Sequence, residues 1–183
     1  MHAAGAAEKI FEYLDTEPSL QLDGPHKTDC LQGSIEFKNV QFTYPTRPET
    51  QILKNISFSV RPGEVVALVG PSGSGKSSCV SLLERFYKPD KGEILIDGIP
   101  ISHYNHKFIH RAIALVGQEP VLYARKISEN IAYGLDEEVK EEQIVNAAQM
   151  ANAHDFVMDT KKMYQTECGE RGVQLSGGQK QVK

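Results

Sequence analysis

The sequence predicts an α/β fold in which a mostly parallel sheet lies beside an antiparallel β region. Residues 65–69 (VVALV) form a continuous apolar run, typical of a strand buried on both faces, and a glycine-rich loop and a helix-compatible stretch follow directly. Residues 113–116 (IALV) are a second short run of this kind. In residues 56–60 (ISFSV), apolar and polar side chains alternate strictly, as in a half-exposed antiparallel strand.

The N-terminal part predicts a helix followed by a linker. Residues 3–15 are rich in alanine, with Ile10, Phe11 and Leu14 on one side. Residues 16–33 contain several prolines and glycines and few bulky apolar side chains, which indicates a linker. Two interpretations of the helix stay open: it packs on something outside this domain, or it is a frayed end.

The next elements follow from alternation and turn chemistry. Residues 34–43 alternate as a strand with a one-residue slip between Phe37 and Val40, which predicts a β-bulge. A helix is expected at 77–87, a turn at 89–92, a strand at 93–96 and a second turn at Asp97 and Gly98.

Further along, two more helices are expected. Residues 126–133 have a helical pattern. The acidic residues of 136–142 are typical of a helix N-terminus, because carboxylates there face the positive end of the helix dipole. The apolar stripe of this second helix consists of Ile144, Ala147, Ala148 and Ala151.

Composition sets outer limits on the function. A chain of 183 residues can build one domain with a real core, and a net charge of −4 gives no broad basic surface for nucleic acid. Its three cysteines have no C-x-x-C pairing and predict free thiols in a reducing compartment, with Cys79 small and buried. The sequence contains no run of 18 apolar residues, so it predicts no membrane span. The first residues do not resemble a signal peptide.

A glycine-rich motif directly follows the apolar run at 65–69. Residues 70–77 read GPSGSGKS and match G-x-x-x-x-G-K-[ST], the phosphate-binding P-loop, at every fixed position. Glycines let such a loop wrap backbone N–H groups around a triphosphate, and the start of the next helix adds about half a positive charge. We therefore predict that Lys76 reaches the β- and γ-phosphates and that Ser77 holds Mg²⁺.

A second glycine motif stands near the C-terminus. Residues 175–179 read LSGGQ and follow GERG at 169–172. The Ser176 hydroxyl and the amides of Gly177 and Gly178 can all face an anion at a helix start. Alone this signal is weak, but together with a P-loop earlier in the chain it is specific.

With both motifs present, the sequence resembles the nucleotide-binding domain of an ABC transporter in the exporter branch. The resemblance covers residues 34–183, and residues 1–33 resemble the helix and linker that join the last membrane helix to this domain. It implies an ABC ATPase fold: a P-loop core with a mostly parallel sheet, an antiparallel β subdomain and a helical subdomain. Residues 169–172 resemble the exporter X-loop, which faces the coupling helices of the partner.

The resemblance also implies ATP and Mg²⁺ as cofactors. Tyr44 matches the A-loop aromatic that stacks on adenine, and Gln118 matches the Q-loop glutamine that touches Mg²⁺ and the attacking water. A tyrosine capping the core and a surface glutamine are the plainer alternatives for these two. The remaining ATP-binding residues are Gly70, Ser72, Gly73, Ser74, Gly75, Lys76, Ser77 and Ser78. The signature that contacts the ATP of a partner domain is Leu175, Ser176, Gly177, Gly178 and Gln179.

The implied partners are a second nucleotide-binding domain, in a homodimer or heterodimer, and the membrane domain of the same transporter. Residues 70–79 (GPSGSGKSSC) and 147–156 (AAQMANAHDF) most resemble the antigen-peptide transporter group and its TAP-like lysosomal peptide exporters. This implies a peptide substrate and a place on the cytosolic face of a lysosomal, endosomal or ER membrane. His103, His106 and His110 lie near one helix face, but no cysteine or carboxylate completes a metal-ligand set at the right spacing.

The sequence departs from the family after the signature. Relatives continue to a Walker B strand ending in Asp and Glu, a D-loop and a switch histidine, none of which follows Gln179 in the printed sequence. Val182 stands where relatives usually carry Arg. We therefore expect a fragment of a longer transporter, with an open sheet edge, uncovered apolar faces and poor solubility.

Two alternatives to an exporter motor domain remain. One is a non-catalytic fragment that binds ATP or pairs with an intact domain through residues 175–179. The other is a soluble ABC-type ATPase of the DNA-repair or translation kind, which would lack the stretch at 169–172 and the N-terminal helix.

We predict that the 183-residue chain alone binds ATP weakly or not at all and does not hydrolyse it at the family's rate. In the family, the Walker B Asp supports Mg²⁺ and the following Glu polarises the attacking water, and no carboxylate of this sequence lies in an equivalent motif. An ATPase assay on the purified chain measures this, and turnover at the rate of an intact domain would contradict it.

Overall fold

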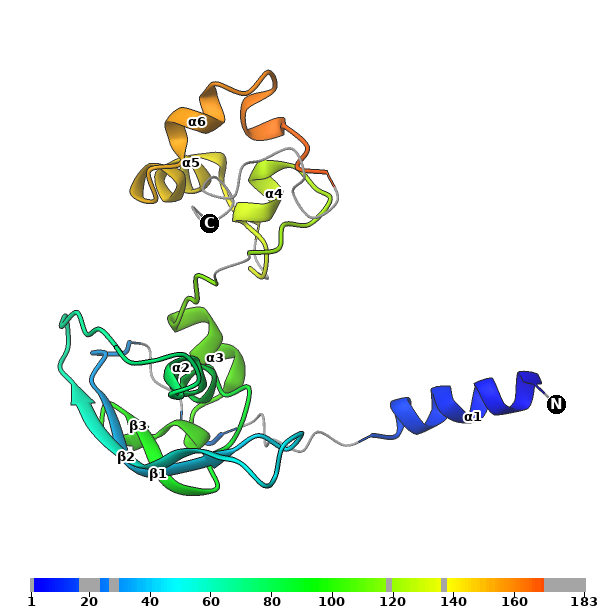
Figure 1. Ribbon diagram of the computed structural model, residues 1–183. Coiled ribbons are helices and arrows are strands. Elements are labelled where there is room, and N and C mark those ends of the chain that lie inside the picture. The colour runs from blue at the N-terminus through cyan, green and yellow to red at the C-terminus, as the bar shows by residue number, and fades with distance from the viewer. Residues whose placement is uncertain (1, 17–23, 27–29, 118–119, 136–137, 170–183) are drawn as a thin grey trace. The chain divides into compact units, whose positions relative to one another are not determined.

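The computed structural model describes residues 2–16, 24–26, 30–117, 120–135 and 138–169, and the chain divides into two compact units (Figure 1). The first unit, Met1–Ala114, contains a four-stranded sheet with helices. In the second unit, Leu115–Lys183, the described elements are helices. Each unit has a hydrophobic core of its own.

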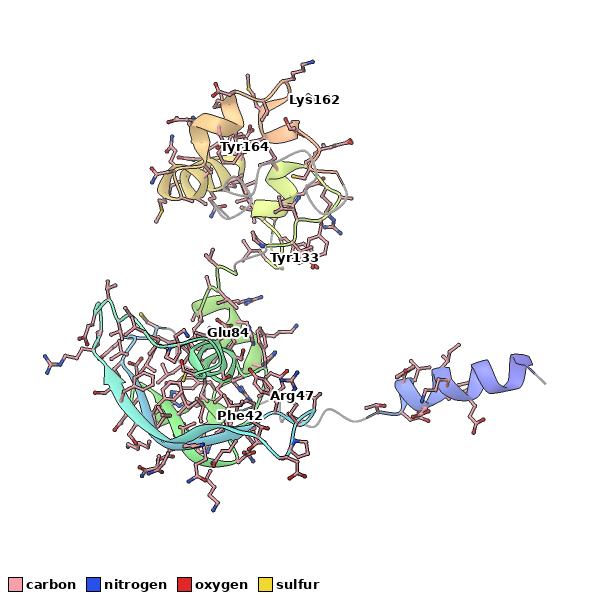
Figure 2. All side chains as sticks on the ribbon, in the orientation of Figure 1. Phe42, Arg47, Glu84, Tyr133, Lys162 and Tyr164 are labelled. Carbon is pink, nitrogen blue, oxygen red and sulfur yellow. The ribbon has the colours of Figure 1, made fainter. Side chains whose placement is uncertain are left out.

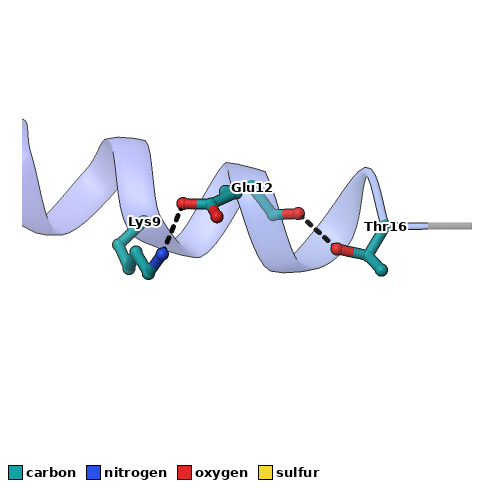
Figure 3. Close-up of polar contacts among 3 residues, drawn as sticks. All are labelled: Lys9, Glu12 and Thr16. Carbon is teal, nitrogen blue, oxygen red and sulfur yellow. Dashed lines mark hydrogen bonds and ion pairs between the residues drawn. The ribbon is translucent and has the colours of Figure 1, made fainter. Parts of the chain in front are cut away.

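Helix α1, His2–Leu14, agrees with the helix predicted at 3–15. Figure 3 shows Lys9 Nζ paired with Glu12 Oε2 at 2.6 Å, and the Thr16 hydroxyl donating to the Glu12 carbonyl at 2.7 Å. The second bond satisfies a carbonyl of the last turn, where helical acceptors lack partners. The apolar side chains of the predicted inner side are more than half exposed: Ile10, Phe11 and Leu14.

The sheet is antiparallel throughout, with the strand order β2-β1-β3-β4. Its strands are β1 (Ile35–Thr43), β2 (Gln51–Val60), β3 (Lys91–Ile96) and the short β4 (Ile99–Pro100). The predicted alternation at 56–60 is confirmed, because Ile56, Phe58 and Val60 are half-buried and the two serines between them are exposed. The antiparallel β region is therefore present as expected.

The predicted bulge in the first strand is also confirmed. Phe37 pairs with Phe58, but the next pair is Val40 with Ile56, so β1 carries one extra residue. Asn39 takes a φ of 49° at this point, and its amide donates to the Ser57 hydroxyl at 2.8 Å. The bulge lets both Phe37 and Val40 turn inward, where they are almost fully buried.

Helices α2 (Lys76–Leu83) and α3 (His106–Ala112) lie on the same side of the sheet (Figure 1), and the 3₁₀ turn η1 (Ile101–His103) precedes α3. Helix α2 is shorter than the predicted 77–87. It ends because Arg85 adopts a left-handed φ of 54° and the Phe86 amide bonds the Ser81 carbonyl at 3.0 Å, which is a helix-terminating motif. The first core lies between sheet and helices and includes Phe37, Val40, Phe42, Leu53, Cys79, Leu82, Ile94, Ile96, Tyr104 and Ile109.

The mostly parallel sheet expected around the glycine loop is absent from the described residues, and this expectation is wrong for the structure. Residues 65–69 and 113–116 belong to no strand. Val65 and Val69 are 97% and 87% exposed. A strand needs hydrogen bonds to neighbouring strands, and none of the described strands pairs with either of these two runs. Val66 and Leu68 nevertheless line an apolar pocket with Phe37 and Cys79, so one face of the first run is partly covered.

The second unit is built from α4 (Ile127–Ile131), α5 (Glu141–Met150), α6 (His154–Met158) and the 3₁₀ turn η2 (Met163–Gln165). Helix α5 begins later than the predicted 136, because Lys140 is its N-cap and the Gln143 side chain accepts from the Lys140 amide at 3.0 Å. The acidic first turn persists as Glu141 and Glu142. The second core consists of Leu122, Ile127, Ile144, Ala148, Ala153, Val157, Tyr164 and Cys168.

None of the helices in the described part of the chain combines the length and the hydropathy that crossing a bilayer requires.

Candidate nucleotide-binding site

The glycine loop at 70–75 leads into α2 and is pressed against β2. Gly73 and Gly75 have φ values of 80° and 92°, in the left-handed region that favours glycine. A Cβ on Gly75 would lie 2.5 Å from Leu53 Cδ2 and 3.2 Å from Ile52 Cγ2. Both the backbone angle and the contact with β2 therefore require glycine at position 75.

Lys76, the first residue of α2, folds back over the loop. Its ammonium donates to the Gly70 carbonyl at 2.9 Å and to the Pro71 carbonyl at 2.8 Å, with the Ser74 hydroxyl at 3.4 Å. Lys76 as a whole is half-buried, and these contacts hold its ammonium at the loop. Hydrogen bonds between a cation and an anionic phosphate are stronger than those to neutral carbonyls, so a phosphate can replace these acceptors.

The start of α2 supplies backbone donors at the same place. The first helical bond runs from the Cys79 amide to the Gly75 carbonyl at 3.0 Å. The amides of the first turn, from Lys76 to Ser78, have no acceptor within the helix, and together with the helix dipole they favour an anion there. Ser77 is exposed beside them, so its hydroxyl can reach a ligand of the loop.

Tyr44 lies just after the end of β1 and reaches the same helix. Its hydroxyl lies 3.0 Å from Ser78 Oγ, and the Ser78 side chain is buried. The tyrosine ring meets Phe42 and Tyr87 in edge-on contacts, with centroids 4.9 and 5.2 Å apart. The structure thus brings Tyr44 to the P-loop helix, in contacts that fit the core-capping alternative as well as an adenine platform.

Tyr87 and the β2 residues Ile52 and Leu53 belong to this site, and sequence reasoning did not find them. Tyr87 holds one edge of the Tyr44 ring, and the two β2 residues form the surface on which Gly75 rests. No local spacing links these residues to residues 70–77. Only an alignment of related sequences could have signalled such contacts between distant segments.

Ionisable side chains cluster at the far end of α2. Glu84, labelled in Figure 2, is buried, and its Oε2 lies 3.5 Å from His110 Nδ1. Burial raises the pKa of the Glu84 carboxyl, and the charge of His110 opposes this rise. Arg85 is also buried and donates to the Tyr104 carbonyl at 3.0 Å. Sequence spacing did not reveal that the Glu84 carboxyl lies next to His110. Among the described residues, no group of three potential ligands is placed to hold a metal ion.

Several predicted site residues lie outside the described residues. These are Gln118, the residues of the signature, Leu175, Ser176, Gly177, Gly178 and Gln179, and positions 170–172 of the X-loop stretch. The structure therefore groups Tyr44 with the P-loop residues and leaves the positions of Gln118 and the signature as predictions.

A loop of this kind, with its lysine folded over it and an open helix start behind it, defines the class of P-loop proteins that bind nucleotide phosphates. The chain belongs to the ABC transporter family, because the family profile described as "ABC transporter" matches residues 53–183. It is the nucleotide-binding domain of that family.

The chain is 59% identical over 181 residues to the human "ABC-type oligopeptide transporter ABCB9", an alignment that covers 99% of this chain and 24% of that protein. It is 48% identical over 177 residues to "Antigen peptide transporter 2" of Rattus norvegicus, covering 97% of this chain and 25% of that protein. It is 50% identical over 184 residues to "Multidrug resistance protein 1" of Entamoeba histolytica, covering 98% of this chain and 14% of that protein. The chain thus spans a quarter or less of the length of these relatives.

We predict that acidification from about pH 7.5 to about pH 5.5 lowers the free energy of unfolding partly through His106. Burial, with the charges of His110 and Arg85, lowers the pKa of His106 below its ordinary 6.5. Between the two pKa values, His106 therefore binds a proton in the unfolded chain but not in the folded chain. This stabilising contribution is present above pH 6.5 and is lost as the pH falls through the folded pKa.

Urea unfolding at both pH values measures the effect, and His106→Gln should make the loss of stability smaller. The raised pKa of Glu84 acts in the opposite sense, so the comparison between wild type and variant isolates His106. His103→Gln, which replaces an exposed histidine of η1, is the matched control. An equal change in both variants would contradict the assignment to His106.

Proposed function

We propose that this chain is the ATP-binding motor domain of an ABC exporter, which couples ATP binding and hydrolysis to the movement of peptides across a membrane. The observation that carries the proposal is the loop at 70–77, where Gly75 rests on β2 and the Lys76 ammonium is held over the loop. The family match supports ATP as the nucleotide, and the names of the relatives support transport.

In this proposal each part of ATP has its own ligands in the chain. The phosphates bind the loop residues Gly70, Ser72, Gly73, Ser74 and Gly75, the Lys76 ammonium and the helix-start residues Ser77 and Ser78. Mg²⁺ is bound by Ser77, whose exposed hydroxyl fits an oxygen ligand for this ion, and by Gln118. The adenine stacks on Tyr44, which the structure holds next to the P-loop helix. Bound ATP supplies the phosphoryl-transfer chemistry.

The proposed partners follow from the signature and the N-terminal helix. Residues 175–179 contact the ATP of a second nucleotide-binding domain, of the same or a sister chain, and residues 1–33 come from the membrane domain. The nucleotide-binding part is then 34–183. The place of action is the cytosolic face of a lysosomal, endosomal or ER membrane.

The names of the relatives favour peptides as the substrate class. The relative named for oligopeptides is 59% identical, and the one named for multidrug resistance is 50% identical over a similar span. A soluble ABC-type ATPase of the DNA-repair or translation kind is disfavoured, because these full-length relatives are all named as transporters or as a resistance protein. An exposed apolar side on α1 also suits a helix that packs against another domain.

We predict that Lys76→Ala in the whole protein abolishes ATP-driven uptake of a fluorescent random peptide library into membrane vesicles. The substitution removes the cation that the loop carbonyls hold in place and that the phosphates require. Lys54→Ala, which removes an exposed lysine of β2, is the matched control and should leave uptake unchanged. Normal uptake by Lys76→Ala would overturn the proposed function.

We predict that Tyr44→Ala weakens ATP binding by about 1–3 kcal/mol, which is the range for a lost base–aromatic stack. Tyr44→Phe keeps the ring and removes only the contact with the Ser78 hydroxyl, so its dissociation constant should stay within about threefold of wild type. Titration of both variants of the whole protein with Mg-ATP measures the two constants. Equal losses would mean that the hydroxyl, and not the ring, carries the role of Tyr44.

A further inference from the structure

The segment between α1 and β1 does not behave as a plain linker where the structure describes it. Residues 24–26 and 30–34 contact other parts of the first unit at two separate places, one beside η1 and one at the turn between β3 and β4. Both contacts use backbone groups of the segment. A flexible tether would leave such groups to water.

The first contact joins Gly24 and His26 to the end of η1. The His26 amide donates to the His103 carbonyl at 2.8 Å, and the His26 ring meets the ring of Tyr104 edge-on at 5.0 Å. Gly24 is buried, and a Cβ there would lie 2.2 Å from the His103 carbonyl oxygen and 2.5 Å from that of Tyr104. The backbone therefore lies directly on these two carbonyl groups.

The second contact gathers three consecutive amides on one carboxylate. Asp97 Oδ2 accepts from the Gln32 amide at 2.7 Å, and Oδ1 accepts from the amides of Gly33 at 3.0 Å and Ser34 at 2.8 Å. The Ser34 hydroxyl adds a contact of 3.1 Å, and the Asp97 amide returns a bond to the Ser34 carbonyl at 3.0 Å. Burial acts to raise the pKa of the Asp97 carboxyl, but the bonds from Ser34, Gln32 and Gly33 outweigh it and lower the pKa.

The Asp97 contact lies where the sheet begins. Ile35, the next residue, pairs with Ile96 in the ladder between β1 and β3. Asp97 itself has a left-handed φ of 51° in the turn that follows β3, which aims its side chain back at the incoming segment. Hydrogen bonds to an ionised carboxylate are about twice as strong as neutral ones, so three on one group fix the chain firmly.

We propose that Asp97 is a positioning residue that docks residues 30–34 at the turn after β3, while the His103 carbonyl docks residues 24–26 beside η1, and that these two docked stretches are fixed points of the connection between the nucleotide-binding domain and the membrane domain. The docking stands on the contacts alone. The mechanical role rests on the proposed function, in which α1 continues from the membrane domain.

The test uses two variants of the whole protein that keep the unusual backbone angle at position 97. Glycine adopts a φ of 51° readily and removes both side-chain acceptor oxygens of Asp97. Asparagine also tolerates this φ and keeps one side-chain acceptor oxygen. Hydrogen–deuterium exchange should rise at amides 32–34 by about tenfold or more in Asp97→Gly and by less in Asp97→Asn. Asp90→Asn is the matched control, because it removes an exposed carboxylate before the other end of β3.

The functional readout is the number of labelled library peptides taken up per ATP hydrolysed, measured with the dissociation constant for Mg-ATP. We expect this ratio to fall severalfold in Asp97→Gly, while ATP affinity stays within about twofold of wild type because Asp97 touches no residue of the loop. Unchanged exchange at amides 32–34 would overturn the docking. Faster exchange with an unchanged ratio would overturn the mechanical role.

A failure of the proposed function gives a different result. In that case the wild-type protein itself would show no ATP-driven uptake, which removes the mechanical role, and the exchange data would still decide whether Asp97 docks the segment.

Discussion

The close approach of the Gly75 backbone to Ile52 and Leu53 of β2 is the constraint on which the site depends. It fixes where the glycine loop meets the sheet, and so where α2 begins and where Lys76 can fold back to the Gly70 and Pro71 carbonyls. A side chain at position 75 would push the loop off the strand. The donors of the first turn would then move as a group, because they follow the helix start rigidly.

Helix α2 is fixed at its other end as well. The buried Arg85 donates to the Tyr104 carbonyl, and the buried Glu84 side chain lies against the half-buried His110 of α3. Losing a hydrogen-bond partner costs more for a buried polar group than for an exposed one, because water cannot take the place of the partner. The helix behind the loop is thus held at both ends, and a ligand finds its donors already placed. Such preorganisation reduces the ordering that binding must otherwise impose.

The features that sequence predicted well depend on local pattern. The bulge near Asn39, the turn at Asp97 and Gly98, and the glycine loop each follow from a few neighbouring residues. The prediction of a strand at 65–69 was wrong. A strand forms only when it can hydrogen-bond to neighbouring strands, and the apolar pattern of one segment does not show whether such neighbours are in place. Contacts such as Tyr44 with Ser78 and Glu84 with His110 join distant segments, so no spacing rule could reveal them. Positions 118 and 175–179 keep the status of predictions.

Tyr104 joins the two systems that the structure reveals. Its carbonyl accepts from Arg85 at the end of α2, and the same carbonyl lies against the backbone of Gly24. Its hydroxyl donates to the Ile96 carbonyl at 2.8 Å, one residue before Asp97. The contacts therefore run without a gap from the glycine loop, along α2, through Tyr104 to the docked segment. A displacement of α2 would move a carbonyl on which residue 24 rests. Packed contacts of this kind resist gradual deformation. Such a shift would therefore either move the docked segment as well or break its contacts with the His103 and Tyr104 carbonyls.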